Sequence, residues 1–270
     1  MPLPETFDNC QLPNDLAKQL RAHDSVMTLA RLGSFFPTRL SFMRELIRQL
    51  AKEGSSVKQT VWSINEDGYG RAVLTINLNH KHYSLIAFTQ PLSEENRTDR
   101  VIAEAWDSTY VLYDGIPSIG DLDRLKKHVP HQEAGRYSDK ELVLSRANKS
   151  VRLFGHVVDR LAQGLQPDFE LVKSTGYLMR TTAVYGNGKF GISDRSKIAI
   201  RGGLSGPFQI EMLAVYLIRE FTHKLVEHIA QQKSPKTAIK LDAKLKRYLG
   251  IGNSTGLGMA PFLISHPVLF

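Results

Sequence analysis

The chain has 270 residues with a hydrophobic content of 42%, which is enough to bury a core in one large domain or two modest ones. It has no run of about 18 uninterrupted apolar residues, and its N-terminus lacks a basic segment followed by an apolar stretch, so we expect neither a membrane-spanning helix nor a secretory signal. The single cysteine, Cys10, excludes an internal disulfide and favours a cytoplasmic setting, and the formal net charge of +8 favours anionic partners.

The first fifty residues predict a pair of helices. Asn14 and Asp15 are suited to cap the first, and the segment 33–37, which contains glycine and proline, interrupts the apolar pattern. Thr38 is suited to cap the second helix, which Gly54 ends.

From Val57 to Tyr113 apolar residues mostly alternate with polar ones, and turn signals such as Asp67-Gly68 separate the runs. Most of the gaps are too short for a crossover helix, which favours antiparallel pairing. We therefore predict a four-stranded antiparallel sheet that ends at Asp114-Gly115.

The remainder reads as mostly helical. The first helix is expected from about Ile119 to His128. A second begins at a capping box of Ser138 and Glu141 and runs toward Gly164. Further helices are expected from Phe208 to Gln232, and from Ser234-Pro235 to Gly250.

These elements predict an α+β protein in two parts. Residues 1–115 hold the helical pair and the antiparallel sheet, and residues 116–270 form a helical region with a short β-hairpin at 181–194 and a glycine-rich loop at 250–258. The apolar C-terminus, which stops at Phe270 without a polar tail, leads us to expect that the chain is a fragment of a longer protein.

The glycine-rich loop is the first candidate functional segment. Four glycines between Gly250 and Gly258, with Asn253, Ser254 and Thr255 among them, can present backbone amides and small polar side chains to an anion. The loop lacks the lysine of a nucleotide-binding phosphate loop, and Thr255 stands where the dinucleotide fingerprint requires glycine. A flexible connection between helices is the alternative interpretation.

The second candidate segment is the predicted hairpin. Asn187-Gly188 is typical of a tight hairpin turn, which would project Lys189 from the tip and place Arg180 near the base. Such a hairpin is suited to clamp a phosphate or an oxyanion, to form a basic wing on nucleic acid, or to be an ordinary surface feature.

Other patterns are weaker. Lys236, Lys240, Lys244 and Arg247 share one face if 235–250 is helical, and such a face is commonly only solvated. Glu220 and His223 have the spacing of carboxylate-bridged metal sites, but no second copy exists, so we expect an exposed ion-paired face and no metal site. The sequence does not identify a cofactor, which stays unknown.

The favoured hypothesis is an enzyme or ligand-binding protein that acts on a small anionic substrate, either phosphorylated or a carboxylate, through these Gly/Asn/Thr-rich loops. Two alternatives stay open: a nucleic-acid-binding protein with a winged-helix-like unit at 138–195, and a protein-interaction domain. The predicted substrate-binding residues are Arg180, Thr181, Thr182, Asn187, Lys189, Asn253, Ser254 and Thr255. The predicted proton-transfer candidates are Tyr185, Asp194 and His266.

Overall fold

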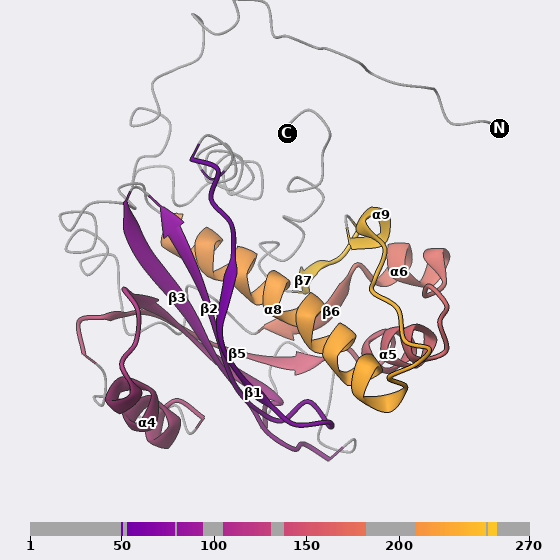
Figure 1. The fold of residues 1–270 in the computed structure, drawn as a ribbon, viewed down its shortest axis with the longest axis horizontal. Helices are drawn as coiled ribbons and strands as arrows, with labels where there is room; N and C mark the ends of the chain where they lie inside the picture. Colours follow the sequence, from indigo (N-terminus) through magenta and orange to yellow (C-terminus); the bar gives the residue numbers. More distant parts are fainter. Residues whose placement is uncertain are drawn as a thin grey trace, which may run out of the picture.

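A computed structural model of the chain describes residues 50, 53–78, 80–93, 105–130, 138–181, 209–246 and 248–252. Within these residues seven strands form one curled sheet in the order β1-β2-β3-β4-β5-β6-β7 (Figure 1). The strands are β1 (Lys58–Ile64), β2 (Gly70–Leu78), β3 (Lys81–Thr89), β4 (Ser108–Asp114), β5 (Glu141–Lys149), β6 (Tyr177–Thr181) and β7 (Gly250–Gly252). The helices are α4 (Ile119–His128), α5 (Phe154–Ala162), α6 (Phe169–Thr175), α8 (Gln209–Lys233) and α9 (Ala243–Lys246).

The predicted fold class, a four-stranded antiparallel sheet followed by a mostly helical C-terminal half, is wrong. β1 to β4 do pair antiparallel where the alternating pattern placed them. The same sheet then continues through β5 and β6, which are also antiparallel, to β7, which joins β6 in parallel. Strands from both sides of the predicted boundary at 115/116 therefore lie in one mixed sheet.

The segment after Ser138 shows why the helix expected there does not form. The backbone N–H of Ser138 does donate to the Glu141 carboxylate, as in a capping box. Glu141 nevertheless begins a strand, and its buried carboxylate accepts a hydrogen bond from Arg124 at 2.6 Å. Pairing with β4 buries the apolar run 142–144, and this tertiary gain outweighs a local signal that is worth about 1 kcal/mol.

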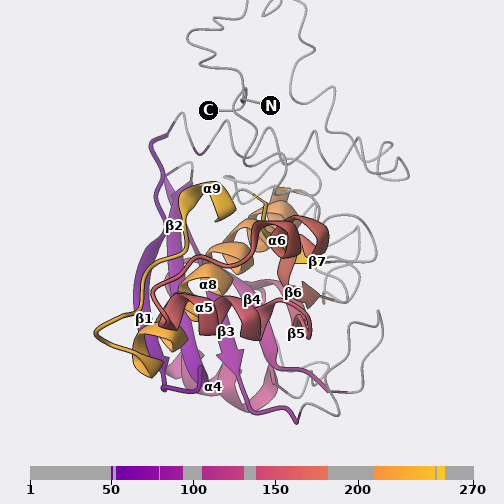
Figure 2. The ribbon, with the colours of Figure 1, turned by 90° about the vertical axis from the view of Figure 1, so that its right-hand side faces the viewer.

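The long helix α8 crosses one face of the sheet (Figures 1 and 2), close to the bounds that its sequence predicted. Its apolar residues Leu217, Phe221 and Leu225 are fully buried in the larger core. Phe221 packs between Trp62 of β1 and Tyr110 of β4, with ring centroids 5.8 and 5.7 Å away. α5 joins the same core, so this face carries most of the buried apolar surface.

The opposite face carries α4, which forms where it was predicted. Leu122 and Leu125 of this helix pack on Val73 and Ile86 in a separate, smaller core. The helix begins at a capping box in which the Ser118 hydroxyl accepts a hydrogen bond from the backbone of Asp121. Hydrogen bonds from Ser118 hold the pKa of the Asp121 carboxyl down to about 2.

The helix expected from Ser234-Pro235 to Gly250 is largely absent, and only the short α9 forms there. Two side chains from elsewhere in the chain bind the backbone of this segment. Leu241 donates its N–H to Glu227 of α8, and the Gln166 amide donates to the Lys240 carbonyl oxygen and accepts the Asp242 N–H. The basic residues at 236, 240 and 244 therefore do not share a helical face.

Several expectations fall outside the described residues, namely the two N-terminal helices and the hairpin beyond residue 181. Among the helices of the described part, none is long and apolar enough to cross a membrane.

Candidate ligand-binding cavity

The sequence-predicted site residues are described only in part. Arg180 and Thr181 lie at the end of β6, where Arg180 is partly exposed and Thr181 is buried. The remaining predicted residues lie outside the described part of the chain: Thr182, Tyr185, Asn187, Lys189, Asp194, Asn253, Ser254, Thr255 and His266. Their roles stay predictions.

The two predicted loops begin side by side. β6 and β7 run parallel, and Arg180 is the register partner of Gly252. Both loops therefore begin at the same end of this strand pair. Gly252 permits this close pairing, because a β-carbon there would lie 2.8 Å from the ring of Tyr177.

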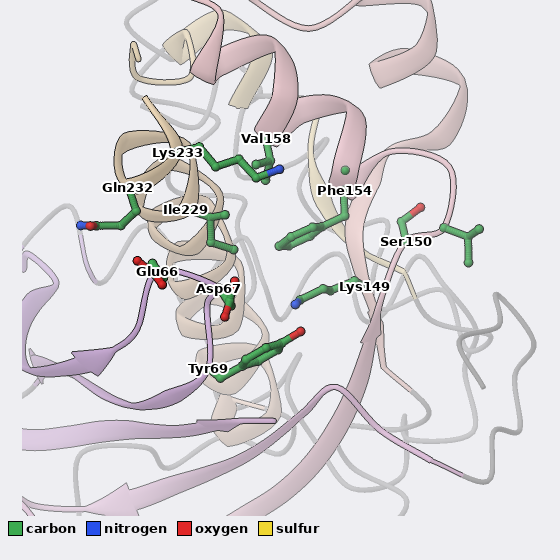
Figure 3. Close-up of a pocket in the computed structure, with 12 residues that line it drawn as sticks. Glu66, Asp67, Tyr69, Lys149, Ser150, Phe154, Val158, Ile229, Gln232 and Lys233 are labelled. Carbon is green, nitrogen blue, oxygen red and sulfur yellow. The ribbon is translucent and has the colours of Figure 1, made fainter. Parts of the chain in front are cut away.

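A cavity of about 540 Å³ opens elsewhere, on the α8 face of the sheet. We call it the β5–α5 cavity (Figure 3). Four segments meet there: the turn between β1 and β2, the end of β5, the first turns of α5 and the last turns of α8. The lining residues are Glu66, Asp67, Tyr69, Lys149, Ser150, Val151, Phe154, Gly155, Val158, Ile229, Gln232 and Lys233. None of them was predicted as a site residue.

The turn that carries Glu66 and Asp67 is fixed to α8. Asn65 closes it, since its side chain accepts the Tyr69 N–H at 2.7 Å, and His228 of α8 lies 3.0 Å from the Asn65 carbonyl oxygen. Gly68 adopts φ +85°, and a β-carbon there would lie 2.5 Å from the Ile229 side chain. Only glycine combines that backbone conformation with that contact.

Lys149, the last residue of β5, holds a buried positive charge in the cavity wall. The residue is 7% exposed, and its ammonium group lies 5.0 Å from the Tyr69 ring centroid and 5.2 Å from that of Phe154. Both rings attract the cation through their negative faces. The backbone is anchored as well, because the Lys149 N–H donates to the Asp107 carboxylate at 2.9 Å.

The rest of the lining divides by polarity. Phe154, Val158 and Ile229 form an apolar wall, and all three are buried. Glu66 and Asp67 are exposed at the mouth, and Asp67 lies across from Lys149 (Figure 3). Lys233 also lines the cavity. Its ammonium pairs at 3.0 Å with the carboxylate of Asp159, a residue that does not line the cavity.

Arg219 and His223 of α8 are buried too, contrary to the exposed face expected for them. Arg219 donates to the carbonyl oxygens of Leu249 and Lys246, at 2.8 and 2.6 Å, and so ties α8 to the segment before β7. Burial, with the nearby cations of Arg219 and Lys246, lowers the pKa of His223 well below its usual value. Arg219 therefore has a structural role, because its donors bind two backbone carbonyl oxygens and the Glu220 carboxylate.

Within the described residues, no group of three or more His, Cys, Asp and Glu side chains is placed to hold a metal ion. Comparison with protein-family models, curated proteins and solved structures finds no match to this chain. The chemistry of the cavity itself is therefore the basis for a functional proposal.

Proposed function

We propose that the chain binds a small organic anion, a carboxylate or a phosphate ester, in the β5–α5 cavity, with Lys149 as the partner of the negative charge. The observation that supports this most directly is the position of the Lys149 ammonium, which is buried, faces the cavity and is held between two aromatic rings.

A pre-positioned cation favours binding. Lysine normally loses side-chain entropy of about 2 kcal/mol when it is fixed. The rings of Tyr69 and Phe154 already hold Lys149, so a ligand does not have to order it. A carboxylate or phosphate oxygen here would accept a charge-assisted hydrogen bond in a partly desolvated setting.

The other walls indicate what else the ligand carries. Phe154, Val158 and Ile229 are suited to a short apolar body, and the cavity volume lies within the usual range for small-molecule sites, about 300–1,000 Å³. Glu66 and Asp67 at the mouth are exposed, so water screens their repulsion of the anion. They favour a ligand whose far end bears an amine or a hydroxyl group.

The loop-based form of the hypothesis remains a second candidate. It is supported by the parallel pairing of β6 and β7, which starts both Gly/Asn/Thr-rich loops at one sheet edge beside Arg180. The winged-helix alternative has less support, because residues 141–149 form a sheet strand.

A thermal-shift screen tests the cavity. The probes are butyrate, 4-aminobutyrate and butyl phosphate, each measured at constant ionic strength. A ligand at about 100 times its Kd adds roughly 2.7 kcal/mol to the free energy of unfolding. We expect stabilisation by at least one probe, with the amino compound stronger than butyrate.

The decisive variants are Lys149→Met and Lys236→Met. Lys149→Met removes the charge at nearly constant length and should weaken the best probe by about 10- to 100-fold, the value of a hydrogen bond to a charged group. Lys236 is exposed and outside the cavity, so its variant should bind as wild type does. Equal binding by wild type and Lys149→Met would refute the proposal.

A further inference from the structure

The sheet carries a second cationic cluster on the face opposite the cavity. Arg146 and Asn148 are two residues apart on β5, so their side chains share a face. Arg180 of β6 is the register partner of Asn148, and Thr109 of β4 is the register partner of Arg146. We call Thr109, Arg146 and Arg180 the arginine patch.

The patch adjoins the small core under α4. Leu144, two residues before Arg146 and on the same face, packs against that helix. Lys149, by contrast, is an odd number of residues from Arg146 along β5, so it belongs to the α8 face. The patch and the β5–α5 cavity are therefore separate sites.

Two buried hydrogen-bond donors in the patch have no acceptor within the described part of the chain. They are the Thr109 hydroxyl group and the Arg146 Nε group, and Thr109 is only 2% exposed. Buried donors are nearly always satisfied in native proteins, because leaving one unpaired costs its full desolvation energy. Two such donors on register partners point to an acceptor that comes from outside.

The Arg146 guanidinium is positioned in advance. It lies over the Trp106 ring, 4.5 Å from the ring centroid. Trp106 is fixed in turn by Asn148, whose side chain accepts the N–H of Asp107 at 2.9 Å and donates to the carbonyl oxygen of Ala105 at 3.1 Å.

Arg180 adds a second positive charge on the same face. It is a diagonal neighbour of Arg146 across the strand pair, a separation of about 7–8 Å that long side chains can bridge. Among the described residues, neither arginine has a carboxylate partner. Arg71, Arg124 and Arg219 all do, at 3.1, 2.6 and 3.1 Å. Two uncompensated like charges in a sheet are unfavourable unless an anion lies between them.

We propose that the arginine patch binds the terminal phosphate group of a small phosphorylated compound. Arg146 Nε and the Thr109 hydroxyl donate to its oxygens, and Arg180 neutralises the second charge. A phosphate monoester fits better than a carboxylate, because it brings close to two negative charges and three acceptor oxygens to two guanidinium groups and a hydroxyl. This proposal does not depend on the function of the cavity.

Isothermal titration with phenyl phosphate tests the patch, at constant ionic strength in chloride buffer and in the Lys149→Met background, which removes the cation of the cavity. We expect one site in Lys149→Met and an affinity about 10- to 100-fold weaker when Arg180→Gln or Arg146→Gln is added. Thr109→Val keeps the shape and removes only the hydroxyl, so it should also weaken binding. Arg180→Lys keeps the positive charge but lacks the paired N–H donors of the guanidinium, so its affinity should lie between those of the arginine and glutamine forms.

Arg71→Gln is the matched control, since Arg71 lies on the same sheet face but is already paired with Asp123. Added to Lys149→Met, it should leave the affinity for phenyl phosphate unchanged. Unchanged affinity in Arg180→Gln, or an equal loss in Arg71→Gln, would overturn the proposal. So would duplex DNA displacing phenyl phosphate at low micromolar concentration, because the patch would then serve a polymer backbone.

Discussion

The two faces of the sheet both bury positive charge, but they compensate it differently. On the α8 face, the Lys149 ammonium lies between two aromatic rings beside a cavity. On the α4 face, one indole ring covers Arg146, and the Arg146 Nε and Thr109 hydroxyl donors have no acceptor among the described residues. A single strand, β5, supplies both cations through its alternation of side chains. Two rings stabilise the first charge, whereas one ring covers the second, and we propose that a bound anion compensates the second.

The faces should also differ in how much stability they supply. Phe221→Ala under α8 should cost about 3–5 kcal/mol of unfolding free energy, because its ring is fully buried between Trp62 and Tyr110. Leu122→Ala under α4 should cost about 2 kcal/mol, at the low end for leucine, because one side of that short helix is exposed and the site can relax. Urea unfolding measures both, and an equal or reversed order would contradict the ranking.

The turn at the cavity mouth gives the next largest effect. Gly68→Ala combines an unfavourable φ with a clash against Ile229, and should cost about 1–3 kcal/mol and weaken cavity ligands. Gly54→Ala is the matched control, because Gly54 also has a positive φ, of +60°, but has open space around it. Its cost should be limited to backbone strain, roughly 1–2 kcal/mol. Thermal unfolding of the two variants separates strain from clash, and equal losses would show that the Ile229 contact is unimportant.

His223 gives the α8 face a pH dependence above about pH 5, whereas the shifted carboxylate of the α4 face, Asp121, titrates only in stronger acid. Its folded pKa lies below its unfolded value of about 6.5, so the unfolded state binds more protons in acid. Its contribution to stability is fully present above pH 6.5 or so and is lost as the pH falls toward the folded pKa, with a slope of at most about 1.4 kcal/mol per pH unit. His223→Leu should flatten the stability profile between about pH 6.5 and 5. A profile with the same slope in this variant would assign the pH dependence to other groups.

The smallest expected effects are the changes in stability when either cation is removed in the absence of ligand. Lys149→Met forfeits two cation–π contacts and should lose about 1–2 kcal/mol of stability. Arg146→Met forfeits the contact with the Trp106 ring, but it also removes an unpaired donor and the repulsion from Arg180, so the free energy of unfolding should change by less than about 0.5 kcal/mol. Chemical unfolding in phosphate-free buffer measures both. A larger loss for Arg146→Met would show that Arg146 already has its partner within the chain.

The sequence predicted some elements well for identifiable reasons. β1 to β3 combine alternation with short gaps, and α8 is long and carries buried residues along most of its length. β5 was missed because a capping box precedes it and an apolar run such as 142–144 fits a helix or a strand equally. Its pairing with β4, which no local pattern encodes, decides the outcome.

The sites were harder to predict than the elements. Arg180 was selected for its place beside a predicted hairpin, and it does lie at a strand end next to another arginine on the same face. Lys149 and Arg146 were missed because a helical interpretation of 138–164 does not place them on opposite faces of a sheet. The cavity unites residues 66, 149, 154 and 233, and only the sheet topology brings them together.

A crossed titration tests most directly whether the two faces hold separate anion sites. The better carboxylate of the cavity screen and phenyl phosphate are each titrated into wild type, Lys149→Met and Arg180→Gln. Separate sites predict that Lys149→Met weakens the carboxylate but keeps a phenyl phosphate site, and that Arg180→Gln weakens phenyl phosphate but leaves the affinity for the carboxylate unchanged. Loss of both ligands in either variant, or of neither ligand in both, would contradict two independent sites.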